Sequence, residues 1–225
     1  MKKVILIKFG GSIMVPEFPD AQYLKDFYEF VERLKSEYRF ILISGGGGIN
    51  KKYNEVAKYI TKVENDKLDW IGIYATRLNA QLLLSVFAPD AHKRVITDPT
   101  SEIDWQEDIL IGAGWKPGWS TDYDSMILAH RFKADKIIVA TNTEHICDKD
   151  PNCNADAKPL DAISWAELKA MVGDEWVPRM HIPLDPSAIR YGMEHDMKVV
   201  SLNGRDLPNM EKAMRGEDFV GTRVG

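Results

Sequence analysis

The sequence has few cysteines, no long hydrophobic run and no excess of basic residues, and each shortage excludes a class of protein. Cys147 and Cys153 lie in one polar loop without a second pair of zinc ligands, so we expect free thiols in a reducing cytoplasm. The formal net charge of −5 argues against nucleic acid as the main partner. No stretch approaches the ~20 apolar residues of a membrane helix. Lys8 interrupts the apolar run 4–7, so we expect no secretory signal.

Two familiar nucleotide-binding patterns are also missing, the dinucleotide fingerprint GxGxxG and the P-loop GxxxxGK[ST]. What is present is an ordinary globular composition over 225 residues, with 44% hydrophobic and 28% charged residues. This length suffices for one large core or two closely joined lobes.

Short β-rich runs alternate with segments of helical period along the chain. The expected strands are 4–7, 40–43, 109–111, 137–140 and 199–202, and the expected helices are 23–34, 50–60, 68–87, 121–132, 164–171 and 186–194. This order predicts an α/β fold, a three-layer αβα sandwich with a mainly parallel central sheet, whose ligands gather at the carboxyl ends of the strands. Residues 148–159 read as a polar surface loop.

Lys8, Gly10 and Gly11 follow directly after the first expected strand. A lysine there leaves the sheet at its carboxyl end, beside two glycines that let backbone amides approach a ligand closely. This arrangement suits an anion, although a glycine turn with a solvated lysine explains the motif alone equally well.

The second motif, Ser44-Gly45-Gly46-Gly47-Gly48, lies between an expected strand and an expected helix that carries Lys51 and Lys52 in its first turn. Four glycines are hard to justify by packing, because each costs conformational entropy on folding. We therefore expect the backbone to approach a phosphate at a helix N-terminus, with a flexible loop as the alternative.

The third motif, residues 112–122, again connects an expected strand to an expected helix. Ser120, Thr121 or Asp122 can cap that helix, which explains an isolated Ser-Thr-Asp sufficiently. Beside two anion-binding loops, a carboxylate there would hold lysines or a magnesium-bound phosphate chain in place.

Together these motifs resemble the amino-acid-kinase family, and within it the short, archaeal-type uridylate (UMP) kinases. The resemblance covers nearly the whole chain and depends on the order and spacing of the motifs. Its further marks are Asp69-Trp70-Ile71-Gly72, Ala75-Thr76-Arg77-Leu78-Asn79-Ala80, Ala140-Thr141-Asn142, Asp150-Pro151, Asp185-Pro186 and Gly221-Thr222. The resemblance implies a single domain, 1–225, with an acceptor-binding lobe at about 1–125 and an ATP-binding lobe at about 126–225.

The resemblance also implies an activity, the transfer of the ATP γ-phosphoryl group to a nucleoside monophosphate, UMP to UDP, with Mg²⁺. Lys8 would steady the transferring phosphoryl group, while Asp122 and Asp185 would organise this lysine and the metal; no dedicated protein metal site is expected. The implied ATP-binding residues are Gly10, Gly11, Ser12, Thr141, Asn142 and Asp150. The implied acceptor-binding residues are Gly46, Gly47, Lys51, Asp69 and Thr121.

Two of these acidic residues have a simpler interpretation. Asp69 and Asp185 could each cap the helix that starts beside it. In the resemblance, Asp69 bonds the acceptor ribose, and Lys51 stands where the family usually has an arginine, which keeps the charge but loses the bidentate geometry.

The chain departs from the family at further places, of which two concern the expected ligand sites. Residues 143–147 read Thr-Glu-His-Ile-Cys where the family usually has Val-Asp-Gly-Val-Tyr, so the glycine and the aromatic residue beside the adenine are lost. Trp115, Lys116 and Trp119 stand where the family tends to small residues or histidine. The tryptophans could stack on a base or cover a subunit interface.

Three functions therefore remain open. The leading one is the nucleoside monophosphate kinase; the others are a kinase of the same fold for another phosphate or a carboxylate acceptor, and a catalytically silent nucleotide-binding sensor or storage protein. The expected partners are the small-molecule substrates ATP and a nucleoside monophosphate, with neither nucleic acid nor membrane. We expect a cytoplasmic homo-oligomer, a dimer or a hexamer.

Overall fold

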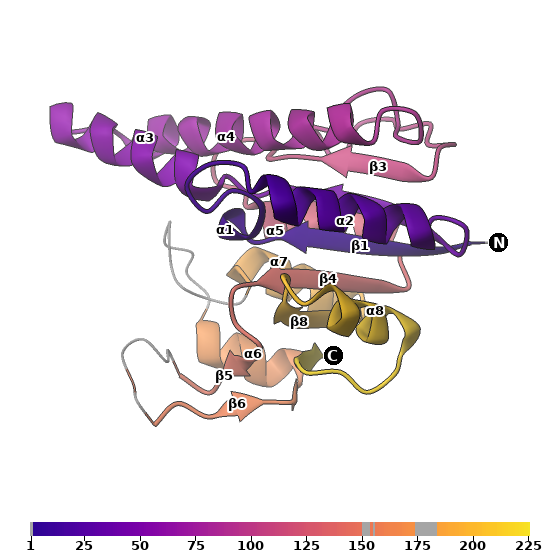
Figure 1. The fold of residues 1–225 in the computed structure, drawn as a ribbon. Helices are drawn as coiled ribbons and strands as arrows, with labels where there is room; N and C mark the ends of the chain where they lie inside the picture. Colours follow the sequence, from indigo (N-terminus) through magenta and orange to yellow (C-terminus); the bar gives the residue numbers. More distant parts are fainter. Residues whose placement is uncertain (1, 150–153, 155, 174–183) are drawn as a thin grey trace.

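A mainly parallel sheet forms the middle of the molecule (Figure 1). The computed structural model describes residues 2–149, 154, 156–173 and 184–225. Its seven-stranded sheet has the order β3-β2-β1-β4-β8-β9-β7; β9 pairs antiparallel with β8 and parallel with β7, so β9 and β7 run opposite to the other five strands. The strands are β1 Lys3–Phe9, β2 Tyr38–Ile43, β3 Ile109–Gly112, β4 Lys136–Thr141, β7 Ala162–Ile163, β8 Val199–Asn203 and β9 Thr222–Val224, and a separate hairpin consists of β5 Ile146–Cys147 and β6 Pro159–Leu160.

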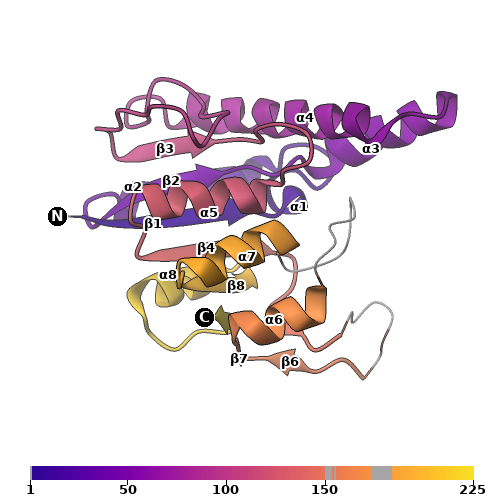
Figure 2. The same ribbon diagram turned by 180° about the vertical axis from the view of Figure 1, so that it is seen from behind.

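Helices cover both faces of this sheet. In Figure 1, α2 and α8 lie in front of the sheet, whereas Figure 2 shows α5, α6 and α7 on the opposite face. The helices are α1 Gly11–Met14, α2 Ala21–Leu34, α3 Gly47–Ile60, α4 Asn65–Val86, α5 Thr121–Arg131, α6 Trp165–Val172, α7 Pro186–Glu194 and α8 Leu207–Arg215. This confirms the predicted αβα sandwich. Within the described ranges no helix is both long and apolar enough to cross a bilayer.

The alternation of side chains along the strands divides the core in two. In β1, Ile5, Ile7 and Phe9 point to the face covered by α2 and α8, and Leu6 points to the face covered by α5 and α7. Phe9 meets Phe27 of α2 edge-on, with ring centroids 4.9 Å apart. Each such fully buried side chain stabilises the fold by about 1.5–3 kcal/mol. The strand ends that carry the polar motifs are therefore anchored from both sides.

All the expected strands and helices are present, but α2, α3 and α4 begin two or three residues earlier than predicted. Helix α3 starts at Gly47, so Lys51 lies in its second turn rather than its first. Helix α4 starts at Asn65 with Glu64 as its N-cap, so Asp69 lies within the helix and the capping interpretation of Asp69 is wrong.

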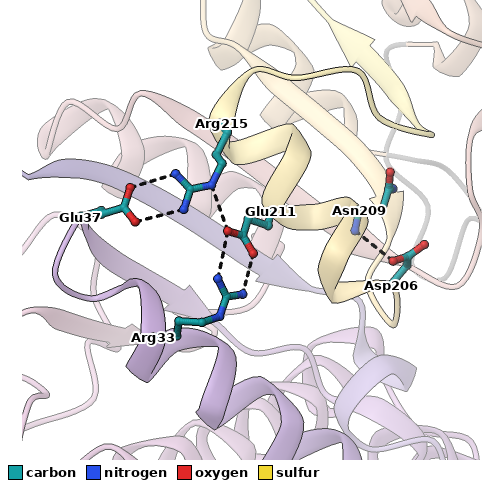
Figure 3. Close-up of polar contacts among 6 residues, drawn as sticks. All are labelled: Arg33, Glu37, Asp206, Asn209, Glu211 and Arg215. Atoms are coloured by element: carbon teal, nitrogen blue, oxygen red, sulfur yellow. Dashed lines mark hydrogen bonds and ion pairs between the residues drawn. The ribbon is translucent and has the colours of Figure 1, made fainter.

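A network of charges joins helices from the two ends of the chain (Figure 3). Arg33 of α2 donates two hydrogen bonds, of 3.0 and 2.6 Å, to the carboxylate of Glu211 in α8. Arg215 donates two, of 2.9 and 3.0 Å, to Glu37, and a third, of 3.0 Å, to Glu211. This surface network connects α2 to α8 over one face of the sheet.

Candidate active site

Four loops leave the carboxyl ends of neighbouring strands and meet at one edge of the sheet. They follow β3, β2, β1 and β4, which lie side by side and parallel in that order. The register places Lys8 beside Ile43 and Ile43 beside Gly112, so the strands end at nearly the same level. The three glycine-containing motifs of the sequence therefore converge, as expected for ligand binding in a parallel sheet.

Lys8 is held at this edge by an acid from α5. Its Nζ lies 2.5 Å from Oδ1 of Asp122, and each of the two side chains is 14% exposed. Partial burial strengthens this attraction relative to that of a surface pair, because the local dielectric is lower. Two of the three residues predicted to be catalytic are thus in contact.

Asp185, the third predicted catalytic residue, connects the N-termini of α7 and α5. Its Oδ1 accepts hydrogen bonds from the amides of Ser187, at 2.7 Å, and Ala188, at 3.1 Å, so the capping interpretation of Asp185 holds. Its Oδ2 accepts a short hydrogen bond from the hydroxyl of Ser120, which is the N-cap of α5. Burial, together with the nearby charge of Asp122, raises the pKa of Asp185 despite these hydrogen bonds.

The glycines of the first two motifs pack backbone against backbone. A Cβ added at Gly11 would collide with the amide nitrogen of Gly47, and one at Gly45 would lie 2.7 Å from the amide nitrogen of Gly11. Gly47 also has a φ of +65°, which favours glycine. Packing therefore does explain these glycines, contrary to the expectation from the sequence, and it joins the two loops into one rigid floor.

A cavity of about 210 Å³ opens beside this floor, between α3, α4 and the loop that follows β3. We call it the Asp69 cavity. Asp69 is the one ionisable side chain among the described residues that border it. Its lining consists of Gly46, Asn50, Asn54, Leu68, Asp69, Gly72, Ile73, Thr76, Gly114, Trp119, Ser120 and Thr121.

The predicted acceptor-binding residues divide into two groups around this cavity. Gly46, Asp69 and Thr121 line it, whereas Gly47 and the exposed side chain of Lys51 lie outside its lining. The N-termini of α3 and α5 reach the cavity through Gly46 and Thr121, so helix dipoles and amides supply positive potential there.

Two asparagines in α3 were missed from the sequence. Asn50 and Asn54 line the cavity, and Nδ2 of Asn54 donates a 2.6 Å hydrogen bond to Oδ1 of Asn50. Oδ1 of Asn54 is buried without a partner among the described atoms. Their i, i+4 spacing on one helix face was the available signal, because a pair of carboxamides on the buried side of a helix needs polar partners.

The loop of residues 113–119 forms the wall opposite α3. Trp119 lines the cavity and stacks on Tyr123, with ring centroids 4.3 Å apart. Trp115 does not line it; the ammonium group of Lys116 lies 3.8 Å from the centroid of the Trp115 ring. The two tryptophan rings lie with their centroids 6.0 Å apart, and only Trp119 borders the cavity.

The predicted ATP-binding residues lie on the other side of Lys8, where β1 and β4 end. The amide of Gly10 donates a 2.7 Å hydrogen bond to the carbonyl of Ala140, and Nδ2 of Asn142 donates to the hydroxyl of Ser12. Thr141 bonds the carbonyl of Thr143 through its hydroxyl, at 2.9 Å. Five of the six predicted ATP-binding residues thus lie together at or just after the ends of β1 and β4. Asp150 lies outside the described residues.

A second cavity, of about 250 Å³, lies between the C-terminal ends of α5 and α7. It borders Ile137 and Lys198, at the amino ends of β4 and β8. It is therefore on the side of the sheet remote from the glycine loops and from Lys8, and we place the candidate active site at the Asp69 cavity.

Comparison with known proteins agrees with this geometry. The model of the amino acid kinase family matches residues 3–203. The uridylate kinase of Methanobrevibacter smithii is 33% identical over 223 residues, which are 98% of each chain. That of Thermococcus gammatolerans is 36% identical over 167 residues, 73% of each chain.

Solved structures show the same fold. The uridylate kinase from Archaeoglobus fulgidus superimposes with a TM-score of 0.81 at 27% identity, and the match covers 99% of this chain and 100% of that one. The UMP kinase from Ureaplasma parvum has a TM-score of 0.78 at 19% identity over 100% and 99% of the two chains, which supports the fold alone. The family model and the uridylate kinase relatives show that this chain belongs to the amino acid kinase family, and its sheet and glycine loops agree with that.

Proposed function

We propose that the protein transfers the γ-phosphoryl group of ATP to a nucleoside monophosphate, converting UMP to UDP. The observation that carries this proposal is the position of Lys8. It is fixed by Asp122 between the ATP-side loops and the Asp69 cavity, where a phosphoryl group in flight would pass. Relatives of similar length with the name uridylate kinase support UMP as the acceptor.

The chemistry needs positioning and charge stabilisation rather than covalent participation of the protein. An acceptor phosphate oxygen forms a bond to the γ-phosphorus while the bond to the ADP oxygen breaks. Lys8 would neutralise charge on the transferring oxygens, and Asp122 would keep its ammonium group aimed at them. The amides at Gly46 and Thr121 would hold the acceptor phosphate, and Asp69 would bond the ribose.

Mg²⁺ fits this arrangement as a companion of ATP. Asp122 contacts Lys8, and its charge also acts on the neighbouring Asp185, so two carboxyl groups lie at the one lysine. The described residues contain no group of three or more side chains placed to hold a metal. Mg²⁺ commonly binds through substrate phosphates and one or two carboxylates, and it neutralises the phosphate charge. We therefore propose that ATP brings the metal and that Asp122 and Asp185 face it.

The test is a coupled assay of ADP release with Mg·ATP and a panel of nucleoside monophosphates, small carboxylic acids and sugar phosphates. UMP should give the highest kcat/KM. A better carboxylic acid or sugar phosphate would contradict the nucleotide assignment while keeping the kinase. Background ADP release with every acceptor would favour the catalytically silent binder.

We also propose that the protein assembles with copies of itself in the cytoplasm. Helices α3 and α4 project beyond the sheet (Figure 1) and carry exposed apolar side chains at helical spacing. These are Tyr53, Val56, Tyr59 and Ile60 on α3 and Trp70, Tyr74 and Leu78 on α4. Tyr74→Glu with Leu78→Lys should lower the mass measured by sedimentation, and an unchanged mass would exclude this face. The division into lobes at about residue 125 is likewise a proposal, testable by limited proteolysis.

A further inference from the structure

Gly114 and Trp115, the second and third residues of the 113–119 loop, are held by side chains instead of by a strand. The amide of Gly114 donates a 2.9 Å hydrogen bond to Oγ1 of Thr76. Arg77 donates to the carbonyls of Gly114, at 3.2 Å, and Trp115, at 2.8 Å. The amide of Trp115 donates a 3.2 Å hydrogen bond to Oδ2 of Asp124. We call Thr76, Arg77 and Asp124 the loop clamp, because they satisfy every backbone polar group of these two residues.

The clamp fixes the start of a loop whose end borders the Asp69 cavity. Three residues beyond Trp115, the amide of Gly118 donates a 3.1 Å hydrogen bond to Oδ2 of Asp69. The next residues, Trp119, Ser120 and Thr121, line the cavity. A shift at the clamp would therefore move three residues of the cavity wall, and displacements of about 1 Å in such positioning elements lower rates strongly.

The buried position of Asp124 lowers the stability of the folded protein. It is 1% exposed in α5, and its Oδ1 is buried without a partner in the described part of the chain. Burial raises its pKa to about 8, and the charges of Asp185, Asp122 and Asp98 add to this effect. An apolar side chain of similar size would avoid these costs. Residues that reduce stability in this way are expected where function requires them.

We propose that Asp124 is a positioning residue of the acceptor site, which holds the 113–119 loop through the amide of Trp115 and so places Trp119, Ser120 and Thr121 against the acceptor. This inference rests on the proposed function, because the acceptor it concerns is the nucleoside monophosphate. Asp124 acts through the loop and does not itself line the cavity.

The first experiment compares Asp124→Leu with Asp124→Asn in the full-length protein. Asp124→Leu removes the acceptor of the Trp115 amide, so the KM for UMP should rise about tenfold, the upper end for one lost hydrogen bond. The KM for ATP should stay within about twofold. Asp124→Asn keeps a carbonyl oxygen for that amide and should restore the KM for UMP to within about threefold of the wild-type value.

Comparing the Tm with the KM for UMP distinguishes a positioning role of Asp124 from a merely structural one. Asp124→Leu removes a buried unpartnered oxygen, so its Tm should equal or exceed that of the wild type while acceptor binding weakens. Met126→Ala, at a fully buried core position of the same helix, is the matched control. It should lower the Tm and leave the KM for UMP unchanged.

A second pair of measurements follows the loop itself. Hydrogen exchange of the 113–119 amides should quicken in Asp124→Leu and stay near wild type in Asp124→Asn. Arg77→Met, which removes two hydrogen bonds to the same loop, should also raise the KM for UMP by about tenfold. Because both residues hold Trp115, the KM for UMP of the double variant should rise much less than the product of the two single-variant factors.

An unchanged KM for UMP in Asp124→Leu, with loop exchange as in the wild type, would overturn the positioning role. Fully multiplicative effects of Arg77→Met and Asp124→Leu would overturn the shared clamp. Failure of the proposed function has a different signature, absence of UMP-dependent ADP release in the wild type. The exchange of the 113–119 amides would then still decide whether Asp124 holds the loop.

Discussion

The surface network of α2 and α8 and the charges around Lys8 are built in opposite ways. In the network, two arginines face two glutamates, and most contacts are paired hydrogen bonds between matched groups (Figure 3). Around Lys8, Asp122 pairs with the lysine, while the buried carboxyl groups of Asp124 and Asp185 accept hydrogen bonds from backbone amides and, for Asp185, from a hydroxyl. The first arrangement pairs opposite charges with each other, whereas the second buries carboxyl groups that are bonded by neutral donors.

The pKa values show the consequence of this difference. In the network, the hydrogen bonds from Arg33 to Glu211 and from Arg215 to Glu37 lower the pKa values of the two glutamates. In the site, burial raises the pKa values of Asp124 and Asp185. Exposed, matched charges cost little and contribute little, whereas buried, unmatched charges cost stability and indicate function.

The largest expected effect is on kcat, which a substitution in the site should lower and a substitution in the network should not. Lys8→Ala should lower kcat by about 10² or more, because the ammonium group acts mainly on the transition state. The KM for UMP should stay within a few-fold of the wild type. Arg33→Ala is the control in the network and should leave kcat unchanged. Steady-state kinetics measure both variants, and an unchanged kcat for Lys8→Ala would remove this residue from the mechanism.

The next largest effect concerns acceptor binding. Asp69→Asn should raise the KM for UMP by about ten- to a hundredfold, since a ribose hydroxyl bonded to a carboxylate contributes about 1.5–3 kcal/mol. The KM for ATP serves as the internal control.

Lys51→Ala is the comparison variant on the acceptor side. Lys51 is exposed outside the cavity lining, so its effect on the KM for UMP should be smaller, about threefold, and should fade as salt is added. A larger effect for Lys51→Ala than for Asp69→Asn would reverse this assignment.

A pH series tests the unmatched carboxylate directly. The pKa of Asp124 is raised from 3.8 to about 8 in the folded protein, so the folded state binds more protons than the unfolded state between these values. The free energy of unfolding should therefore fall as pH rises from about 4 to about 8, by at most about 1.4 kcal/mol per pH unit from this group. Urea unfolding at pH 5.5 and 7.5 measures the slope.

Asp124→Asn is the control in that series, because asparagine does not titrate. The loss of stability between the two pH values should be smaller in this variant than in the wild type. Equal losses would mean that Asp124 is already ionised in the folded protein at the lower pH.

The smallest effect belongs to the surface network. Glu211→Gln removes the charge shared by Arg33 and Arg215, and the Tm should fall by about 1–3 °C at low salt, because exposed ion pairs contribute little. Added salt should reduce the difference, and kcat should not change. A fall of more than about 10 °C would show that the network joins α2 to α8 more tightly than its exposure suggests.

Local patterns were sufficient to predict the fold. Short β-rich runs and periodic segments identified the five long strands and six of the helices, since these elements bury regular apolar faces. Helices α1 and α8 and strands β5, β6, β7 and β9 escaped prediction; apart from the nine-residue α8, these elements have only two to four residues and carry too little periodicity. The order and spacing of all the motifs together were enough to recognise the family.

Only the tertiary structure decided which motif residues line the cavity and which pack against each other. The sequence by itself determined that Lys8, three loops after strands and several acidic residues belong to one edge of a sheet, because parallel strands end together. It did not determine that Gly11, Gly45 and Gly47 serve each other's packing, or that Lys51 lies outside the lining of the cavity that Asn50 and Asn54 line. Those outcomes depend on where α3 begins and how closely two loops approach, which are contacts between residues far apart in the chain. The role of Asp124 was hidden for the same reason, since its partner Trp115 is brought to it by the turn from β3 into α5.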